Sequence, residues 1–185
     1  MPTEKTPVNM LEDIAIDDAH CDLIYGLVRS QKPRSILEIG YGSGRSSLRI
    51  RQAVNDNRGD CDYTIVDNWH DWNGSKPTHT AEAFEFGATI VEMDEGEFVN
   101  SCRETFDFIL IDADHSKSEQ YFDRVYWTLT NTGGILIYHD VTNRGWPNLY
   151  EIKKMCIDRD ARYRLFNKNS SPSERCDRGL LVIFK

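Results

Sequence analysis

Residues 35–47 read SILEIGYGSGRSS, a short apolar run followed by three glycines at alternate positions and then a polar stretch. Gly40, Gly42 and Gly44 allow a tight turn between a strand and a helix, in which the backbone can approach a ligand. The amide groups at the start of the following helix are then free to bind that ligand. This stretch therefore predicts a ligand-binding connection of the kind found in open α/β sheets.

The same alternation of apolar strands and amphipathic helices continues along the chain. Strands are predicted over 35–40, 63–67, 88–93, 106–112, 134–140, 162–167 and 179–184, and helices over 19–30, 44–57, 95–104, 116–134 and 146–160. In the helix over 116–134, Gly133 and Gly134 are expected to end the helical pattern. Strands that are almost entirely apolar indicate a mainly parallel sheet with both faces covered. The fold class is thus α/β, a Rossmann-like doubly wound sheet of seven strands.

Length and charge limit the kinds of partner. The 185 residues suit a single domain over 1–185, with residues 1–30 as an N-terminal helical segment. The net charge of −8 argues against nucleic acid or an anionic membrane as the main partner. There is no apolar run long enough to cross a membrane, so a cytoplasmic protein is expected. Five cysteines without a CxxC pair are expected to be reduced thiols.

Each of the first five predicted strands has a glycine or an acidic residue at its end or just after it. These residues are Gly40, Asp67, Asp94, Asp112 and Asp140. In open α/β sheets, ligands bind beyond the carboxyl ends of the strands. The five residues are therefore expected to line one binding site.

Two residues of the glycine-rich stretch argue against a nicotinamide or flavin cofactor. The dinucleotide fingerprint has a small residue where Arg45 stands. Glu38 adds negative charge where a pyrophosphate would bind, and a carboxylate is better suited to a cationic ligand. A NAD-dependent oxidoreductase is therefore the weaker alternative.

The stretch ILEIGYGSG resembles the first motif of class I S-adenosylmethionine-dependent methyltransferases, with Asp67 at the spacing of that family's ribose-binding acid. The resemblance implies that Glu38 holds the methionine end of S-adenosyl-L-methionine, and that Asp94 contacts the adenine with Met93 packing on the ring. It also implies the strand order 3-2-1-4-5-7-6, with the last pair antiparallel. The cofactor-binding residues implied are Glu38, Gly40, Tyr41, Gly42, Gly44, Asp67, Asn68, Met93, Asp94 and Asp112.

FDFILIDADHS at 106–116 and GGILIYHDV at 133–141 resemble one branch of that family, the small-molecule O-methyltransferases related to the catechol and macrolide-sugar enzymes. The resemblance implies that His115 is the general base and that Asp112 is the second catalytic residue. It places magnesium or another divalent cation on Asp112, His139 and Asp140. Histidine is not a typical magnesium ligand, so the sequence leaves open a softer metal or none.

Other readings remain open. The acceptor is expected to be a small molecule, and a homodimer is one option for completing its pocket. An N-methyltransferase without metal and a non-enzymatic nucleoside-binding module are the further alternatives. Trp69, His70, Trp72 and Trp146 are expected either to line the acceptor pocket or to pack beneath their own loops, and residues 168–178 to form a mobile loop. His20 and His79 are expected at the surface or in helix caps.

Overall fold

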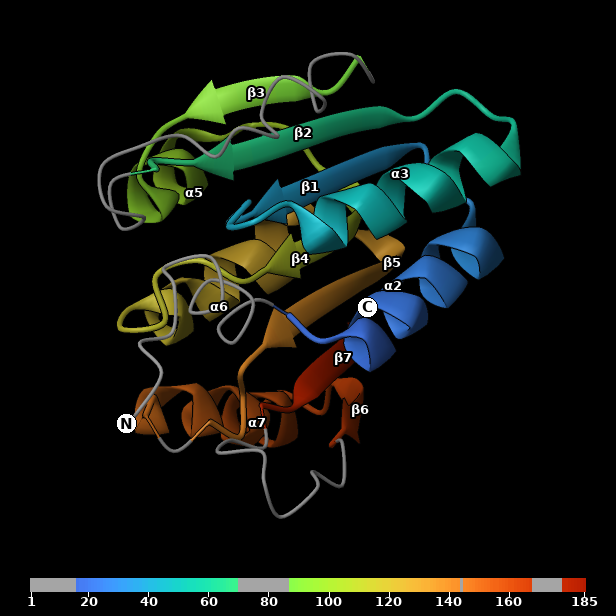
Figure 1. Cartoon of the computed structure of the whole chain (residues 1–185). Helices are drawn as coiled ribbons and strands as arrows, with labels where there is room; N and C mark the ends of the chain where they lie inside the picture. The colour runs from blue at the N-terminus through green and yellow to red at the C-terminus, as the bar shows by residue number, and fades with distance from the viewer. Residues whose placement is uncertain (1–15, 70–86, 144, 168–177) are drawn as a thin grey trace, which may run out of the picture.

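The computed structural model describes residues 16–69, 87–143, 145–167 and 178–185. Seven strands form one sheet in the order β3-β2-β1-β4-β5-β7-β6 (Figure 1). Strands β1 to β5 pair in parallel, whereas β7 pairs antiparallel with both β5 and β6. This confirms the predicted fold class and strand order. The strands are β1 (Ser35–Ile39), β2 (Asp62–Asp67), β3 (Thr89–Glu92), β4 (Phe106–Ile111), β5 (Thr130–His139), β6 (Arg162–Phe166) and β7 (Leu180–Phe184).

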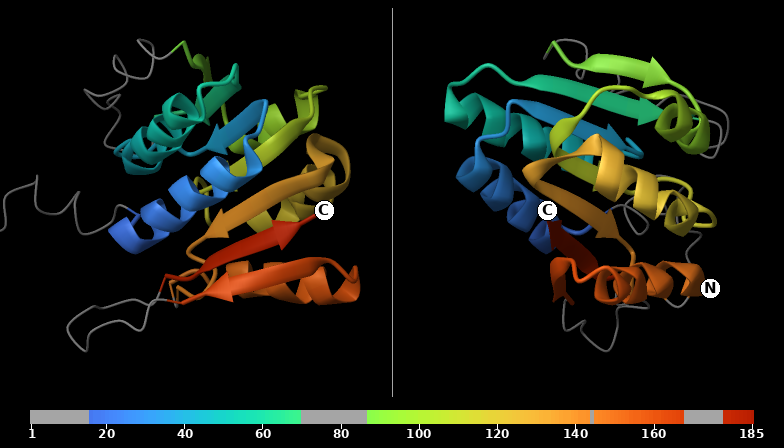
Figure 2. Two further views of the ribbon diagram at one scale, coloured as in Figure 1. Left: turned by 90° about the vertical axis from the view of Figure 1, so that its right-hand side faces the viewer. Right: turned by 180° about the vertical axis from the view of Figure 1, so that it is seen from behind.

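Helices cover both faces of this sheet. One face carries α2 (Asp18–Gln31) and α3 (Arg45–Asn57), and the other carries α5 (Glu95–Ser101), α6 (Phe122–Arg124) and α7 (Tyr150–Asp158) (Figures 1 and 2). Short helical turns precede or extend two of them, namely η1 (Ser118–Tyr121), η2 (Val125–Leu129) and η3 (Pro147–Leu149). None of the described helices is long and apolar enough to cross a lipid bilayer.

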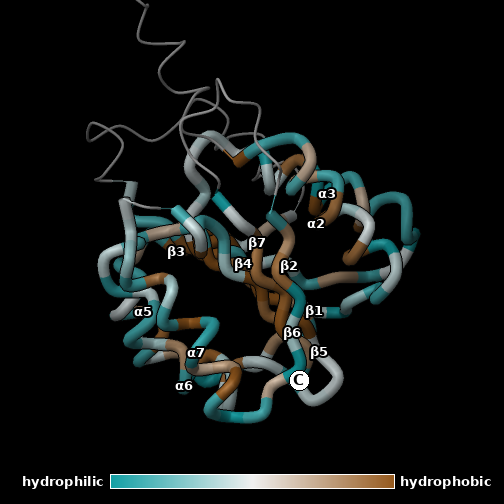
Figure 3. The backbone as a smooth tube through the Cα atoms, turned by 90° about the horizontal axis from the view of Figure 1, so that it is seen from below, coloured by the Kyte–Doolittle hydropathy of each residue, from teal (hydrophilic) through white to brown (hydrophobic). Residues whose placement is uncertain are grey.

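Alternation of side chains along the strands divides the core into two layers. In β4, Phe108 and Leu110 pack toward α2 and α3, whereas Ile109 and Ile111 pack toward α5, α6 and α7. Successive side chains of a strand point to opposite faces, so a fully apolar strand supplies both layers. The sheet accordingly forms an apolar centre between more polar helices (Figure 3).

Two aspartates cap the N-termini of helices α2 and α5. Asp17 caps α2 by accepting a hydrogen bond from the His20 amide at 2.9 Å. Asp94 caps α5 by accepting hydrogen bonds from the amides of Gly96 and Glu97 at 2.9 and 3.2 Å. Such caps satisfy amide groups that have no partner within the first turn of a helix.

The helix predicted over 116–134 is shorter than expected. A π-helical turn ends at Leu129, and the chain continues directly as β5 from Thr130. Gly133 and Gly134 therefore lie inside a strand, where Gly133 adopts a φ of +83°. The Gly133 amide donates to the Lys185 carbonyl at 2.8 Å, and Gly134 in turn accepts from the Lys185 amide at 3.1 Å. The prediction was wrong because pairing with a distant segment outweighs the local tendency of two glycines to break the chain.

Candidate active site

A cavity of about 490 Å³ lies at the carboxyl ends of the parallel strands. Small-molecule sites typically measure roughly 300–1,000 Å³, so the space suits a ligand of that class. Most of the residues predicted to act here line it: Gly40, Tyr41, Gly42, Asp67, Asn68, Met93, Asp94, Asp112, His115 and Asp140. The exceptions are Glu38, Gly44 and His139, which are buried and are not among the lining residues.

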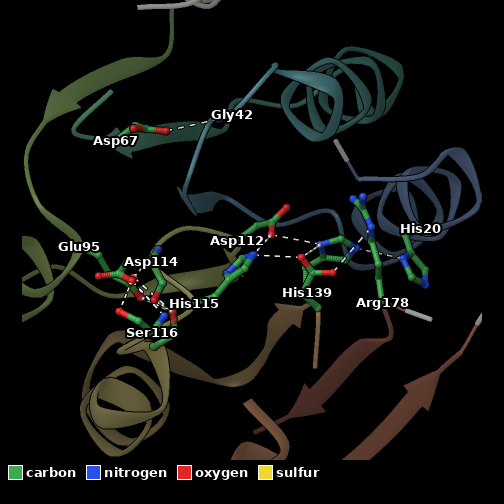
Figure 4. Close-up of polar contacts among 12 residues, drawn as sticks. His20, Gly42, Asp67, Glu95, Asp112, Asp114, His115, Ser116, His139 and Arg178 are labelled. Atoms are coloured by element: carbon green, nitrogen blue, oxygen red, sulfur yellow. Dashed lines mark hydrogen bonds and ion pairs between the residues drawn. The ribbon is translucent and has the colours of Figure 1, made fainter. Parts of the chain in front are cut away.

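Asp67, at the end of β2, holds the glycine-rich loop in shape. One carboxylate oxygen, Oδ2, accepts hydrogen bonds from the amides of Tyr41 at 2.7 Å and Gly42 at 3.4 Å (Figure 4). The other oxygen accepts from the Trp69 amide at 2.7 Å. Because Asp67 also lines the cavity, the carboxylate that would receive a ligand is the one that fixes the loop around it.

The loop also passes very close to the end of β4. Gly40 has a φ of +95°, and a β-carbon at this position would stand 2.2 Å from the Asp112 carbonyl oxygen. Only glycine tolerates both the backbone conformation and the contact. The glycine-rich loop and the backbone of Asp112 therefore lie in direct contact.

Glu38 supports the loop from below instead of lining the cavity. Its side chain is fully buried and accepts hydrogen bonds from the hydroxyls of Ser46 and Ser47 at 2.5 Å each, and from Tyr63. Burial raises the pKa of Glu38 to about 7, although the three hydroxyl donors act in the opposite direction. Its contact with the methionine end of a cofactor stays a prediction.

Met93, Asp94 and Glu95 form the wall next to β3. Asp94 uses Oδ1 for the α5 cap, and Oδ2 takes no part in that cap. The Glu95 side chain is 5% exposed and accepts hydrogen bonds from the Asp114 amide and the Ser118 hydroxyl, both at 3.2 Å. Burial raises the pKa of Glu95 to about 7. No pattern in the sequence signals Glu95, apart from its place beside Asp94.

At the opposite end of the cavity, two carboxylates meet one imidazole (Figure 4). His139 Nδ1 lies 3.1 Å from Asp112 Oδ1 and 3.8 Å from Asp140 Oδ2. Ligand atoms of these three residues all lie within 4.8 Å of one another. Burial alone would lower the pKa of His139, but the charge of Asp112, its hydrogen bond to the ring and the charge of Asp140 together raise that pKa.

The backbone at Asp140 explains why two adjacent residues share this cluster. Neighbouring side chains of an extended strand point to opposite faces of the sheet. Asp140 has a φ of +59°, in the left-handed region, immediately after β5 ends at His139. This turn brings both side chains toward Asp112, and an uncommon backbone conformation of this kind is often concentrated at functional sites.

His115 joins the cluster from the cavity side. Its Nε2 lies 3.0 Å from Asp140 Oδ2 and 3.7 Å from Asp112 Oδ1. Burial would lower the pKa of His115, but the hydrogen bond to Asp140 and the charge of Asp112 raise it. The Asn148 side chain donates a hydrogen bond to the His115 carbonyl at 2.5 Å. The Trp146 ring meets the imidazole edge-on, with the two ring centroids 5.5 Å apart. The ring is therefore held at the cavity by several neighbours.

Sequence reasoning missed two residues of this region. The prediction that His20 is a surface or capping side chain was wrong, because it is only 3% exposed and its Nδ1 lies 3.2 Å from His139 Nε2. Arg178 lines the cavity, with Nε 4.0 Å from Asp140 Oδ1. Both contacts join residues far apart in the sequence, and no local pattern signals them.

Of the two tryptophans that the structure describes in this region, one lines the cavity and the other is buried. Trp146 lines the cavity, whereas Trp69 is 2% exposed and packs near the Tyr41 ring. His70, Trp72 and His79 lie outside the described residues, as do 168–177 of the predicted mobile loop and 1–15 of the N-terminal segment.

The cluster fits a divalent cation. Carboxylate oxygens and imidazole nitrogens are both common ligands of such ions. Asp140 Oδ1 is buried and accepts no hydrogen bond from any residue within the described ranges. Asp112, His139 and Asp140 are the residues that would hold the ion.

The part of the chain that carries these residues matches the model of a known protein family. The family model described as "Methyltransferase domain" matches residues 37–141, which include the glycine-rich loop and the whole acidic cluster. None of the curated proteins matches the chain.

Solved structures of similar fold include several methyltransferases. The O-methyltransferase TomG from Streptomyces achromogenes, involved in tomaymycin synthesis and solved with SAM, is 16% identical with a TM-score of 0.71, over 93% of this chain and 82% of that one. A putative caffeoyl-CoA O-methyltransferase from Staphylococcus aureus is 19% identical with a TM-score of 0.71, over 98% and 94%. Precorrin-6y C5,15-methyltransferase from Geobacter metallireducens is 13% identical with a TM-score of 0.69, over 93% and 90%. At these identities the likeness establishes the shared fold.

Proposed function

This chain belongs to the methyltransferase-domain family, and we propose that it transfers a methyl group from S-adenosyl-L-methionine to an oxygen of a small-molecule acceptor. One observation carries the proposal. His115 Nε2 lies within 4 Å of two carboxylates at one end of a cavity whose other end is the glycine-rich loop and Asp67. The proposed cofactor site and the proposed proton acceptor thus share one cavity.

The first half of the cavity suits the cofactor. S-adenosylmethionine supplies a methyl group on a sulfonium and leaves as S-adenosylhomocysteine once the acceptor oxygen has taken that methyl. In this proposal Asp67 accepts the ribose hydroxyls and Asp94 Oδ2 accepts the adenine amine, with Met93 beside the ring; all three residues line the cavity. Glu38 anchors the first turn of α3 beneath the loop through Ser46 and Ser47.

The second half suits removal of a hydroxyl proton. The His115 imidazole takes the proton of the acceptor hydroxyl, and the Asp140 carboxylate, which accepts a hydrogen bond from Nε2, stabilises the charge that the ring then carries. Asp112 and the edge-on Trp146 ring fix the direction of that nitrogen. A divalent cation bound by Asp112, His139 and Asp140 would lower the pKa of the acceptor hydroxyl and orient it.

The oxygen assignment is supported by the arrangement of base and acidic cluster, and by the O-methyltransferases among the structural neighbours. The fold itself is shared with a precorrin methyltransferase and does not choose the accepting atom. The size of the cavity and the net charge of −8 support a small acceptor over a nucleic acid.

The first test is titration calorimetry with S-adenosylhomocysteine, on the wild type and on Asp67→Ala, with magnesium and again with chelator. Asp62→Ala is the matched control, because Asp62 is exposed at the opposite end of the same strand. Binding should be tight in the wild type and in the control, and at least tenfold weaker in Asp67→Ala. No binding to folded wild type would overturn the cofactor assignment and revive the NAD-dependent alternative.

An acceptor screen then tests the accepting atom. Hydroxyl-bearing and amine-bearing small molecules are offered with the cofactor, with and without chelator, and products are identified by mass. Methylated hydroxyl groups are expected. An amine methylated equally well in chelator would overturn both the oxygen assignment and the role of the metal.

A further inference from the structure

Behind the acidic cluster, His139 has a second buried histidine as its neighbour. His139 Nε2 lies 3.2 Å from His20 Nδ1, and the two rings meet edge-on with centroids 5.2 Å apart (Figure 4). His20 Nδ1 is also 3.3 Å from Asp17 Oδ2. Asp17, His20, His139 and Asp112 thus form a continuous polar chain from the first turn of α2 to the cavity.

A metal requires one particular tautomer of His139. The nitrogen that faces Asp112 and Asp140 is Nδ1, so an ion bound with these carboxylates needs the Nδ1 lone pair. The ring proton must then reside on Nε2, and the partner of Nε2 must accept it. His20 Nδ1 is the atom in that position.

Without an ion, the same contacts serve the opposite tautomer. His20 Nδ1 then donates to His139 Nε2 and lies beside Asp17 Oδ2, while His139 Nδ1 donates to Asp112 Oδ1. An imidazole can donate or accept at the same nitrogen, which an apolar side chain cannot. His20 therefore supports His139 in both states.

The orientation of His20 is fixed by its own surroundings. Asp17 caps α2 and accepts a hydrogen bond from the His20 amide, so the same carboxylate holds the backbone and lies beside the ring. The ring is almost fully buried against the core. Partners of this kind, which orient a metal ligand without touching the metal, typically change metal affinity by about 10- to 100-fold when they are removed.

The donor set also selects among metals. Magnesium prefers oxygen ligands and usually keeps several of its bound water molecules, so it binds imidazole nitrogen poorly. Divalent transition metals bind imidazole well. Two carboxylates with one fully buried imidazole give a mixed oxygen and nitrogen site. Such a set favours ions of intermediate softness.

We propose that His20 is the positioning residue that makes His139 a metal ligand, and that the resulting site takes a divalent transition metal such as Mn²⁺ or Co²⁺ in preference to Mg²⁺. The proposal rests on the metal-assisted methyl transfer proposed above. Through His20, helix α2 thereby influences how tightly the cluster binds its ion, although no residue of α2 is a ligand.

The test measures metal binding directly. Mn²⁺ is titrated into metal-free protein and the unbound ion is followed by electron paramagnetic resonance, and Mg²⁺ is then added as competitor. The wild type should bind Mn²⁺ at least tenfold more tightly than Mg²⁺. His139→Glu, which makes the donor set all oxygen, should reduce that preference to about threefold or less. The visible absorption spectrum of bound Co²⁺ should differ between this variant and the wild type.

Two substitutions at position 20 test whether His20 acts by orienting the His139 ring or only by filling space in the core. His20→Leu removes the polar partner and should weaken Mn²⁺ binding by about 10- to 100-fold, whereas His20→Asn keeps a group at the Nδ1 position that can donate or accept and should stay within about threefold of the wild type. Thermal unfolding of both variants checks that they are folded. If His20→Leu is unfolded, the comparison of His20→Asn with His20→Ala decides in its place.

Equal affinity of the wild type for Mg²⁺ and Mn²⁺, or unchanged Mn²⁺ binding in the folded apolar variant, would overturn the proposal. S-adenosylhomocysteine binding is measured on every variant and should be unchanged. Loss of cofactor binding in the wild type would refute the proposed function, and the metal titration would still decide the role of His20.

Discussion

The Gly40 α-carbon faces the Asp112 carbonyl oxygen so closely that a β-carbon on Gly40 would stand 2.2 Å from that oxygen. The two residues directly follow neighbouring strands, β1 and β4. Gly40 belongs to the glycine-rich loop, whereas Asp112 belongs to the acidic cluster. Their contact sets the distance between the two halves of the cavity.

Replacing Gly40 with alanine should therefore damage stability and binding together. The substitution adds a clash with backbone and a side chain at a φ of +95°, so the free energy of unfolding should fall by about 2–4 kcal/mol. Urea denaturation measures this change. Gly59→Ala is the control, since a β-carbon there meets nothing within 4 Å, and it should change stability by less than about 0.5 kcal/mol.

The buried carboxyl of Glu38 should make stability depend on pH. Its pKa is raised from 4.5 to about 7 by burial, so the folded protein holds this proton where the unfolded chain releases it. Stability from this group is complete below about pH 4.5 and falls as the pH rises to about 7, by on the order of 3 kcal/mol. Glu38→Gln cannot titrate, so the stability of the wild type relative to this variant should decline across that range.

Denaturation of both proteins at several pH values tests the role of Glu38. The exposed Glu104 gives the control, and Glu104→Gln should follow the wild-type curve at every pH. Parallel curves for Glu38→Gln and the wild type would show that Glu38 is ionised in the folded protein.

Substitutions of Asp94 should distinguish its role as the cap of α5 from its proposed role in cofactor binding. Alanine removes the α5 cap and should cost about 1 kcal/mol of stability. Asparagine keeps an oxygen for the cap but places an amide where Oδ2 would accept the adenine amine. Asp94→Asn should therefore retain stability and lose about tenfold in S-adenosylhomocysteine affinity, which is about 1.4 kcal/mol. Unchanged affinity in the asparagine variant would remove Asp94 from the cofactor site.

His115 should affect turnover and leave binding intact. With an acceptor from the screen, His115→Gln should lower kcat by about 10²- to 10⁴-fold, because the ring that takes the hydroxyl proton is gone. S-adenosylhomocysteine affinity should be unchanged, since His115 lies at the far end of the cavity from Asp67. Lys117→Gln, an exposed neighbour, is the kinetic control. A wild-type kcat in His115→Gln would assign the base to another group.

The strands and the rim of the site were predictable because their signals are local. Each parallel strand is a largely apolar run with a glycine or an aspartate at its end or shortly after it, and the glycine-rich loop carries the family resemblance. The boundary of β5 was not predictable in this way. Gly133 and Gly134 favour a break, yet their hydrogen bonds with Lys185 keep them in a strand.

The inner part of the site depends on contacts between distant residues. His20 contacts His139 only because the first turn of α2 packs behind the end of β5. Strand alternation would have placed His139 and Asp140 on opposite faces, and the left-handed backbone at Asp140 overrides it. Neither feature leaves a pattern in the neighbouring sequence.

The strand order has a consequence for the folding of the site. Strand β7 lies between β5 and β6, so β6 has no neighbour in the sheet until β7 has been added. Arg178 precedes β7 and reaches the cavity only with that strand. Pairing of β7 with β5 therefore joins β6 to the sheet and also brings Arg178 to the wall of the cavity.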